Sequence, residues 1–332
     1  MPEARRWAPW AGLALLLALP PFAHAIGDPY LVSIATRGVI LALAVVGLDF
    51  ILGYGAMVSF GHAAFVGAGA YTVGILAFHA REGGAVLGGA LGLTGTHSAL
   101  LAWPLAVAVA ALLALGIGAL SLRTRGLYFI MITLAFGQMI YYLGTSLERY
   151  GGDDGLVLWQ RSTLPGISTT DPLQFYYLCV GLLALVVILL RRAVAARFGR
   201  VLRGTAENER RMRALGFPVY RYRLAAFVIA GGVGGLAGAL LANQNTFVSP
   251  ELLHWRHSGE MLIMVILGGL GTLHGAVVGA IALVLLEAVL AAWTEHWMIV
   301  LGPVLVAVVL FARHGLWGAL FGRASGEGTH GA

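Results

Sequence analysis

Long apolar runs alternate with short polar segments along almost the whole chain of 332 residues. A helix of about 20 apolar residues is long enough to cross the hydrocarbon core of a bilayer. The pattern predicts an all-α membrane protein, a polytopic bundle of about nine to ten transmembrane helices. The expected spans are 8–26, 31–52, 58–79, 98–121, 126–146, 173–190, 224–243, 259–273, 275–293 and 297–312.

The first apolar segment has two interpretations. Arg5 and Arg6 precede it and an Ala-His-Ala triplet follows it, as in a signal peptide with a small-residue cleavage site. We favour an uncleaved first span or signal anchor within residues 1–30, because a multi-span chain follows. N-terminal sequencing separates the two, since cleavage predicts a mature protein that starts at Ile26.

Basic residues set the expected orientation, because Arg and Lys concentrate in cytoplasmic loops. A cytoplasmic N-terminus leaves both termini cytoplasmic and puts 16 of the 21 basic residues inside. These are Arg5, Arg6, Arg123, Arg125, the ten Arg residues between 191 and 223, Arg313 and Arg323. We expect residues 319–332 to form a short disordered cytoplasmic tail.

Composition narrows the class of protein. Hydrophobic residues make up 59% of the chain and charged residues 11%, which excludes an ordinary soluble domain. Every basic residue is Arg, so the Lys that a P-loop requires is missing and any ATP-driven work needs a separate subunit. The net charge of +6 comes from Arg residues between apolar runs, which argues against nucleic-acid binding. Cys179 lies in an apolar run and is expected to be a buried, inert thiol.

No constellation for hydrolysis or group transfer stands out, so we expect a transport subunit and not an enzyme. The sequence has no G-x-S-x-G motif and no Cys/His pair with metal-ligand spacing, and we expect no cofactor. Glu251, His254, His257 and Glu260 recur every three residues and would share a helix face that could ligate a metal. We expect no metal there, because Pro250 makes the polar start of a helix an equally natural explanation.

Glycines are abundant, with 47 in the chain, and many recur at four-residue spacing. Small faces of this kind let helix backbones approach closely in lipid. The clearest examples are Gly231 with Gly235, Gly234 with Gly238, and Gly271 with Gly275 and Gly279. Two clusters, 53–61 beside His62 and 268–275 beside His274, instead interrupt apolar runs, like the broken helices that surround midplane sites in transporters.

The most polar cytoplasmic segment contains GTAENERRMRALGF at 204–217. Glu207 and Glu209 precede a group of Arg residues, an order that matches the helix macrodipole. Gly216 can form a left-handed C-cap, and Pro218 blocks continuation of the helix. We expect a short amphipathic helix at the membrane face, and the alternative is an ordinary Arg-rich loop.

Ionisable residues inside spans are costly in lipid and each is a functional lead. We expect Asp49 and Glu287 to brace helices by pairing with a Ser, an Arg or a backbone group. His62 is either a hydrogen-bonded packing residue or part of a substrate path, and Glu260 has the same two interpretations.

The loop resembles the EAA-type coupling segment of ABC importer permeases, and the wider chain resembles the branched-chain amino acid permease family of LivM type. The likeness covers about residues 31–318. It rests on SFGHAAFVGAGAY from Ser59, RTRGLYFIMITLAFGQM from Arg123, GGDDGL from Gly151, AENE in the loop, and VSPELLHWRHSGEMLIMVILGGLGTLHGAVVGA from Val248. One departure is visible, because Arg210, Arg211 and Met212 stand where the family usually has an Ala pair.

The resemblance implies a permease of a bacterial inner membrane that forms a heterodimer with a related permease. Two ATP-binding subunits and a periplasmic substrate-binding protein would complete the importer. The domain would span 31–318, with a cytoplasmic coupling loop at 191–223. The candidate coupling residues are Glu207, Asn208, Glu209, Arg213 and Gly216, and the candidate substrate-path residues are Ser59, Gly61, His62, Thr133, Gln138 and Glu260.

Three further expectations concern an outer turn, the cargo and the class of transporter. The turn Gly151–Gly155 with Asp153 and Asp154 lies on the outer side, where its acids could face the binding protein or a substrate ammonium, although a plain type I turn also explains it. Branched-chain or other small hydrophobic amino acids are the expected cargo, and urea or short-chain amides are the alternative. A secondary transporter or channel is the alternative of another class, but it should have a coupling carboxylate in mid-span, and few exist here.

Overall fold

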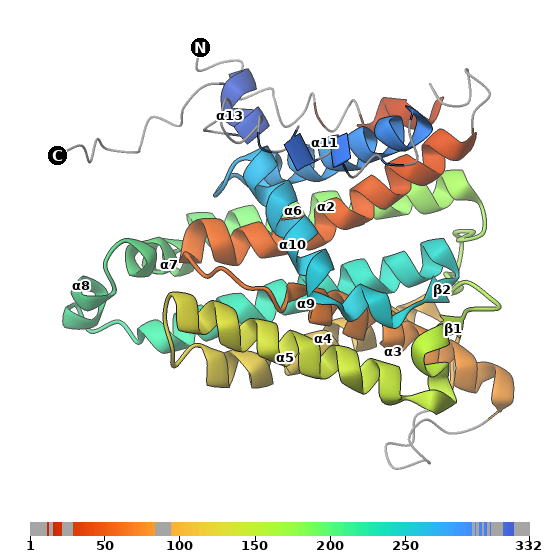
Figure 1. Cartoon of the computed structure of the whole chain (residues 1–332), viewed down its shortest axis with the longest axis horizontal. Coiled ribbons are helices and arrows are strands. Elements are labelled where there is room, and N and C mark those ends of the chain that lie inside the picture. The colour runs from red at the N-terminus through yellow and green to blue at the C-terminus, as the bar shows by residue number, and fades with distance from the viewer. Residues whose placement is uncertain are drawn as a thin grey trace.

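The protein is a bundle of long helices in the computed structural model of the chain (Figure 1). The structure describes residues 29–83, 94–293 and 315–321, with scattered residues in 12–21 and 296–306. Within these residues, seven helices are long and apolar enough to cross a membrane. They are α2 (Pro29–Gly55), α3 (His62–Glu82), α4 (Ala99–Ser121), α5 (Leu127–Ser146), α6 (Pro172–Ala195), α9 (Val219–Asn245) and α11 (Leu273–Trp293).

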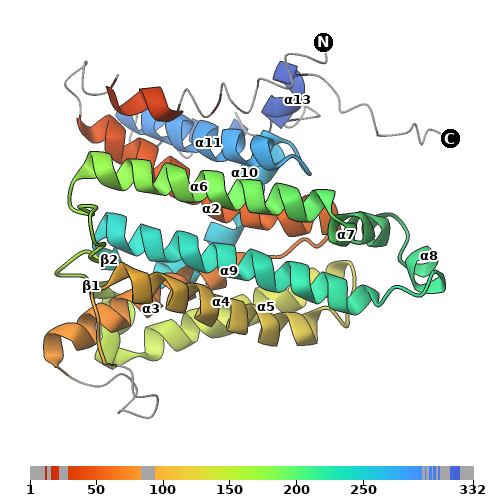
Figure 2. The same cartoon turned by 180° about the vertical axis from the view of Figure 1, so that it is seen from behind.

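Shorter elements complete the described fold. They are α7 (Arg197–Glu207), α8 (Glu209–Ala214), α10 (Trp255–Gly268), α13 (Gly315–Phe321), the 3-10 helices η2 (Glu148–Tyr150), η3 (Gly152–Asp154) and η4 (Pro250–Leu253), and the antiparallel strands β1 (Leu156–Val157) and β2 (Phe247–Val248). Helices α7 and α8 project from one end of the bundle, which we call the α8 end (Figures 1 and 2). The strands lie at the opposite end, which we call the β1–β2 end.

The prediction of a polytopic helical bundle is confirmed. One span differs, because α10 has 14 residues where 259–273 was expected to cross the bilayer, and this is shorter than the roughly 20 residues that a crossing needs. The predicted spans 8–26 and 297–312 fall largely outside the described residues. The predicted tail 319–332 also lies outside them, except that α13 reaches Phe321.

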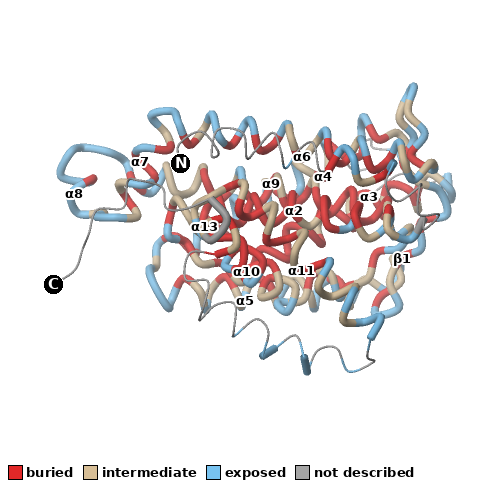
Figure 3. The backbone as a smooth tube through the Cα atoms, turned by 90° about the horizontal axis from the view of Figure 1, so that it is seen from above, coloured by how far each residue is buried: buried red, intermediate tan, exposed pale blue. Residues whose placement is uncertain are grey.

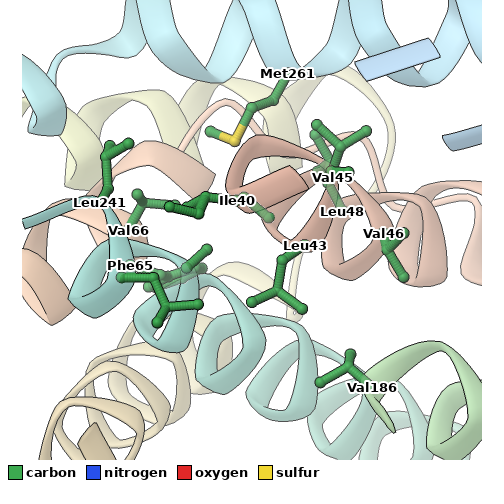
Figure 4. Packing of buried hydrophobic residues seen from close by; sticks show 14 of the residues in the cluster. Ile40, Leu43, Val45, Val46, Leu48, Phe65, Val66, Val186, Leu241 and Met261 are labelled. Atoms are coloured by element: carbon green, nitrogen blue, oxygen red, sulfur yellow. The ribbon is translucent and has the colours of Figure 1, made fainter. Parts of the chain in front are cut away.

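Helix α2 forms the centre of the bundle, because it packs against α6, α9, α10 and α11. Its residues from Val39 to Ile51 are almost all buried, as expected for a helix that is apolar on every side. Figure 3 shows buried backbone concentrated along the middle of the bundle and exposed backbone on α8. Figure 4 shows apolar side chains of α2 meeting those of its neighbours; the labelled residues are Ile40, Leu43, Val45, Val46, Leu48, Phe65, Val66, Val186, Leu241 and Met261.

The glycines of α9 explain how closely three helices approach. A Cβ at Gly235 would overlap Ala110 of α4, and one at Gly238 would overlap the carbonyl of Val66 in α3. The face with Gly231 and Gly235 therefore packs on α4, and the face with Gly234 and Gly238 packs on α3. The predicted packing role of these glycines is confirmed.

Candidate functional site

The break between α2 and α3 reaches the middle of the bundle. Ala56 has a left-handed φ of 51°, and residues 56–61 turn back from the end of α2 into the bundle (Figure 1). His62, the first residue of α3, has its Nε2 3.2 Å from the carbonyl oxygen of Ala44. Ala44 lies near the midpoint of α2, so α3 begins at about half the depth of the bundle.

Side chains from α5 and α10 hold this break in place. The Phe60 N–H donates to Thr133 Oγ1 at 3.3 Å, and the Ala63 N–H donates to Ser258 Oγ at 2.9 Å. Ser258 thereby satisfies one of the backbone donors that the start of a helix leaves free. Gly61 is needed here, because a Cβ would lie 2.7 Å from the carbonyl oxygen of Thr133.

Four of the candidate path residues therefore meet at this break, where they bind one another or the backbone. Ser59 is fully buried and its Oγ accepts the Gly61 N–H at 3.3 Å. The His62 ring is also fully buried and packs edge-on against Phe65 with 5.8 Å between centroids. Thr133 is buried as well, so these side chains shape the break in this conformation and do not line an open passage.

Gln138 and Glu260 lie apart from that cluster. Gln138 is half-buried on α5, and its Nε2 has no hydrogen-bond partner among the described residues. Glu260 lies on α10, its side chain is 45% exposed, and its Oε2 is 2.9 Å from Nδ1 of His257. Within the described part of the chain, no three His, Cys, Asp or Glu residues converge as metal ligands.

The second glycine cluster contacts the first, but nearer the α8 end of α2. Gly269 and Gly271 have left-handed φ values of 112° and 70° and form the turn between α10 and α11. A Cβ at Gly53 would overlap the backbone of Gly271, so the two segments touch. The sequence distinguished both clusters, although only the one beside His62 reaches mid-depth.

The predicted bracing roles of Asp49 and Glu287 are confirmed. Asp49 is fully buried, and its Oδ1 accepts the Gly271 N–H at 2.8 Å, which ties α2 to the second glycine turn. Glu287 Oε1 lies 3.5 Å from Nη2 of Arg37 and links α11 to α2.

At the α8 end, residues 204–217 form two helical pieces where one short helix was expected. Asn208 is extended, with φ −153° and ψ 95°, and its Oδ1 accepts the Arg211 N–H at 2.9 Å, so it ends α7 and caps α8. The predicted end at Gly216 is confirmed by its φ of 84°. The Phe217 N–H donates to the Met212 carbonyl at 3.1 Å, as in a Schellman motif.

Glu209 connects three parts of the chain through ion pairs. Its carboxylate lies 2.9 Å from Arg125 in the α4–α5 connection, 2.6 Å from Arg213 in α8, and 3.2 Å from Arg223 in α9. Only 12% of the Glu209 side chain is exposed. The two Arg-rich segments that were expected on one side of the membrane therefore lie together.

The tip of the same segment exposes apolar side chains among basic ones. Leu215 is 65% exposed and Phe217 is 37% exposed, next to the exposed Arg210, Arg211 and Arg213. We call these five residues the α8 knob.

Met212 marks the departure from the usual family pattern at this segment. Its side chain is buried with Val201 and Val219. It also lies against Gly204, where a Cβ would come within 2.7 Å of the Met212 sulfur. Met212 therefore fixes α8 onto α7.

A cavity of about 340 Å³ lies near the β1–β2 end. It is lined by Tyr141, Asp153, Ser249, Pro250, Glu251, His254 and Arg256. Sequence reasoning singled out Glu251 and His254 together and Asp153 apart from them, but it missed Arg256 and Tyr141. Tyr141 comes from within α5 and Arg256 from the start of α10, and nothing in the sequence shows that they share one cavity with Asp153.

Comparisons with known proteins show the family of the chain. Residues 30–309 match the family described as branched-chain amino acid transport system, permease component. The high-affinity branched-chain amino acid transport system permease proteins LivM of Salmonella typhimurium and Escherichia coli are each 28% identical over 321 residues, covering 88% of this chain and 72% of theirs.

More distant relatives widen the group. The probable branched-chain amino acid transport permease protein LivM of Methanocaldococcus jannaschii is 26% identical, over 80% of this chain and 83% of its own. An autoinducer 2 import system permease protein LsrC of Salmonella paratyphi B is 28% identical over 54% of each chain. No solved structure matches. This multi-pass membrane protein belongs to the family of permease components of branched-chain amino acid transport systems.

Proposed function

We propose that this chain is the permease subunit of an ATP-driven importer in a bacterial inner membrane, with branched-chain or other small hydrophobic amino acids as cargo. It would pair with a related permease, two ATP-binding subunits and a periplasmic binding protein. The names of the LivM relatives support the cargo, and the lack of Lys for a P-loop supports separate ATPases.

The proposal rests on the α8 knob, which projects from a segment that ion pairs hold against the bundle. Two exposed apolar side chains, Leu215 and Phe217, stand among three Arg residues, which suits a groove with an apolar floor and acidic rims on an ATPase. Glu209 ties the base of the knob to α9 and to the α4–α5 connection. A push on the knob is therefore transmitted to α9, α4 and α5.

The substrate path would run along the side of the bundle where α5 and α10 lie, and the second permease would complete it. This side carries the half-exposed Glu260 and Gln138, whose buried Nε2 has no hydrogen-bond partner among the described residues. Ionisable groups at membrane depth face an interior or an aqueous path, because lipid solvates them poorly. The break at 56–61 gives this path a discontinuous helix near mid-depth, where transporters bind cargo.

The proposed cycle is alternating access. Closure of the ATPases moves the α8 knob and rocks α5 and α9 about the mid-depth break, which opens one face as the other closes. The positive-inside rule supports a cytoplasmic α8 end, because twelve described Arg residues lie at this end of the bundle. They are Arg123, Arg125 and the ten Arg residues between 191 and 223.

A variant in the knob and a control variant in α6 test the coupling. Leu215→Asp in the complete transporter should abolish cargo uptake and cargo-stimulated ATP hydrolysis while the protein stays in the membrane. Leu185→Asn alters an exposed residue of α6 far from the knob and should leave the coupling intact. Normal uptake by the Leu215 variant, or by a transporter that lacks 204–217, would refute the proposal.

A further inference from the structure

The charged groups around the cavity at the β1–β2 end have no ion-pair partners within the described residues. Asp153, Glu251 and Arg256 each line the cavity, and none forms a salt bridge within 4.0 Å there. Arg149 at the same end is instead paired with Glu82. Two acids and one base around one cavity provide opposite charges for a ligand that carries both.

The start of α10 adds a second feature that favours an anion. His254 caps this helix of 14 residues, because its Nδ1 accepts the Arg256 N–H at 3.3 Å. Because Nδ1 is occupied as an acceptor, the ring can donate only from Nε2. The N-terminus of a helix attracts negative charge, so His254, Arg256 and the helix start together suit a carboxylate.

Other residues of the lining suit a cation and a hydrocarbon side chain. Asp153 comes from η3 and Glu251 from η4, and either carboxylate can accept an ammonium. Tyr141 packs edge-on against His254 with 5.1 Å between ring centroids and gives the cavity an aromatic wall. A volume of about 340 Å³ is at the small end of the range for ligand pockets, which fits an amino acid with a few waters.

We propose that this cavity is an outer binding site for the head group of a free α-amino acid, with Arg256 at the carboxylate and Asp153 and Glu251 at the ammonium. This site deepens the proposed function and rests on its amino acid cargo. It also has a direct connection to the mid-depth break, because Ser258, two residues after Arg256, binds the Ala63 N–H at the start of α3. Cargo held at the cavity would therefore lie at the outer end of the path along α10.

Photo-crosslinking tests the site directly. The purified complex of permeases and ATPases, without binding protein, is illuminated with photo-leucine, the diazirine analogue of leucine. Crosslinks should map to Tyr141 and the segment 249–256. Excess leucine should suppress them, whereas leucinamide, which lacks the carboxylate, and 4-methylpentanoate, which lacks the ammonium, should not at the same concentration. This competition needs no variant, so it stands even if a variant fails to fold.

Variants then assign the charges. Arg256→Gln and Asp153→Asn should each weaken half-maximal labelling by about tenfold or more, since one charge-assisted hydrogen bond is lost. Asp154→Asn in the same turn and Arg149→Gln at the same end remove matched charges outside the cavity lining and should change labelling little. Labelling elsewhere, equal competition by leucinamide, or unchanged labelling in both cavity variants would overturn the site.

Two other results separate the alternatives. If the cavity variants lose association with the binding protein but keep photo-leucine labelling, the cavity is a docking surface and the inference is wrong. If the wild-type complex takes up no leucine with ATP, the proposed function fails, whatever the crosslinks show.

Discussion

Replacing Glu209 by glutamine removes a single charge from the point where α8, α9 and the α4–α5 connection meet. Arg125 is 53% exposed, so its pair with Glu209 contributes only about 0.5 kcal/mol, and the pair with Arg213 lies within α8 and does not hold it to its neighbours. Arg223 is 15% exposed, and a charged hydrogen bond in such a setting contributes roughly 1.5–3 kcal/mol. Because the amide oxygen of the new side chain would still accept one hydrogen bond, we expect α8 docking to weaken by about 2–3 kcal/mol.

Such a loss should raise the population of undocked α8 by roughly 30- to 150-fold. Trypsin reports this opening, since Arg210, Arg211 and Arg213 lie in α8 and cleavage of a rapidly opening segment follows its open population. Inside-out membrane vesicles expose the expected cytoplasmic side to the protease.

Glu207→Gln is the matched control, because it removes the same charge from an exposed pair. Glu207 and Arg211 are 71% and 59% exposed, so their pair contributes only about 0.3–0.5 kcal/mol and cleavage should rise about twofold. Equal cleavage rates in the two variants would refute the reasoning that Glu209 fixes α8. The Glu209 variant should also transport less than the Glu207 variant, because its α8 is docked less firmly against α9 and the α4–α5 connection.

Two further predictions concern stability in detergent. Gly238→Val should lower the melting temperature or prevent assembly, because its side chain would overlap the Val66 backbone at a cost of about 1–3 kcal/mol or more. Gly181→Ala, with open space around it, should have little effect. Equal melting temperatures of the two variants would contradict the packing. Asp49→Leu should destabilise the folded protein by about 1–3 kcal/mol, because the Gly271 N–H loses its buried acceptor. Asp49→Asn keeps an acceptor oxygen and should retain most of the stability. A Leu variant as stable as the Asn variant would contradict this role.

Much of the helical architecture follows from local pattern. The spans predicted at 98–121 and 126–146 differ from α4 and α5 by one residue at their starts, because polar or glycine residues border each apolar run. The end of α8 at Gly216 was also predictable, since glycine adopts the left-handed conformation of that cap without strain. The stop of α10 at Gly268 was not predicted, since the span was expected to run to 273, although the glycine cluster 268–275 begins at that point.

The sites depend on contacts that sequence spacing does not encode. Glu209 was a candidate from its position before the Arg group, yet its pairing with Arg125 and Arg223 needs α4, α5 and α9 to be placed in space. Asp153 and Arg256 meet at one cavity although about a hundred residues separate them along the chain. Apolar helices pack in many arrangements of similar composition, so the pairing of their polar ends is set by the tertiary fold.

Uptake by the reconstituted transporter tests the central claim most directly. Proteoliposomes that contain this chain, its companion permease, two ATPases and the binding protein are supplied with labelled leucine or labelled urea. We expect leucine to accumulate only with ATP and the binding protein, and urea not to accumulate. Accumulation of urea in place of leucine, or uptake of leucine that does not depend on ATP, would contradict the account.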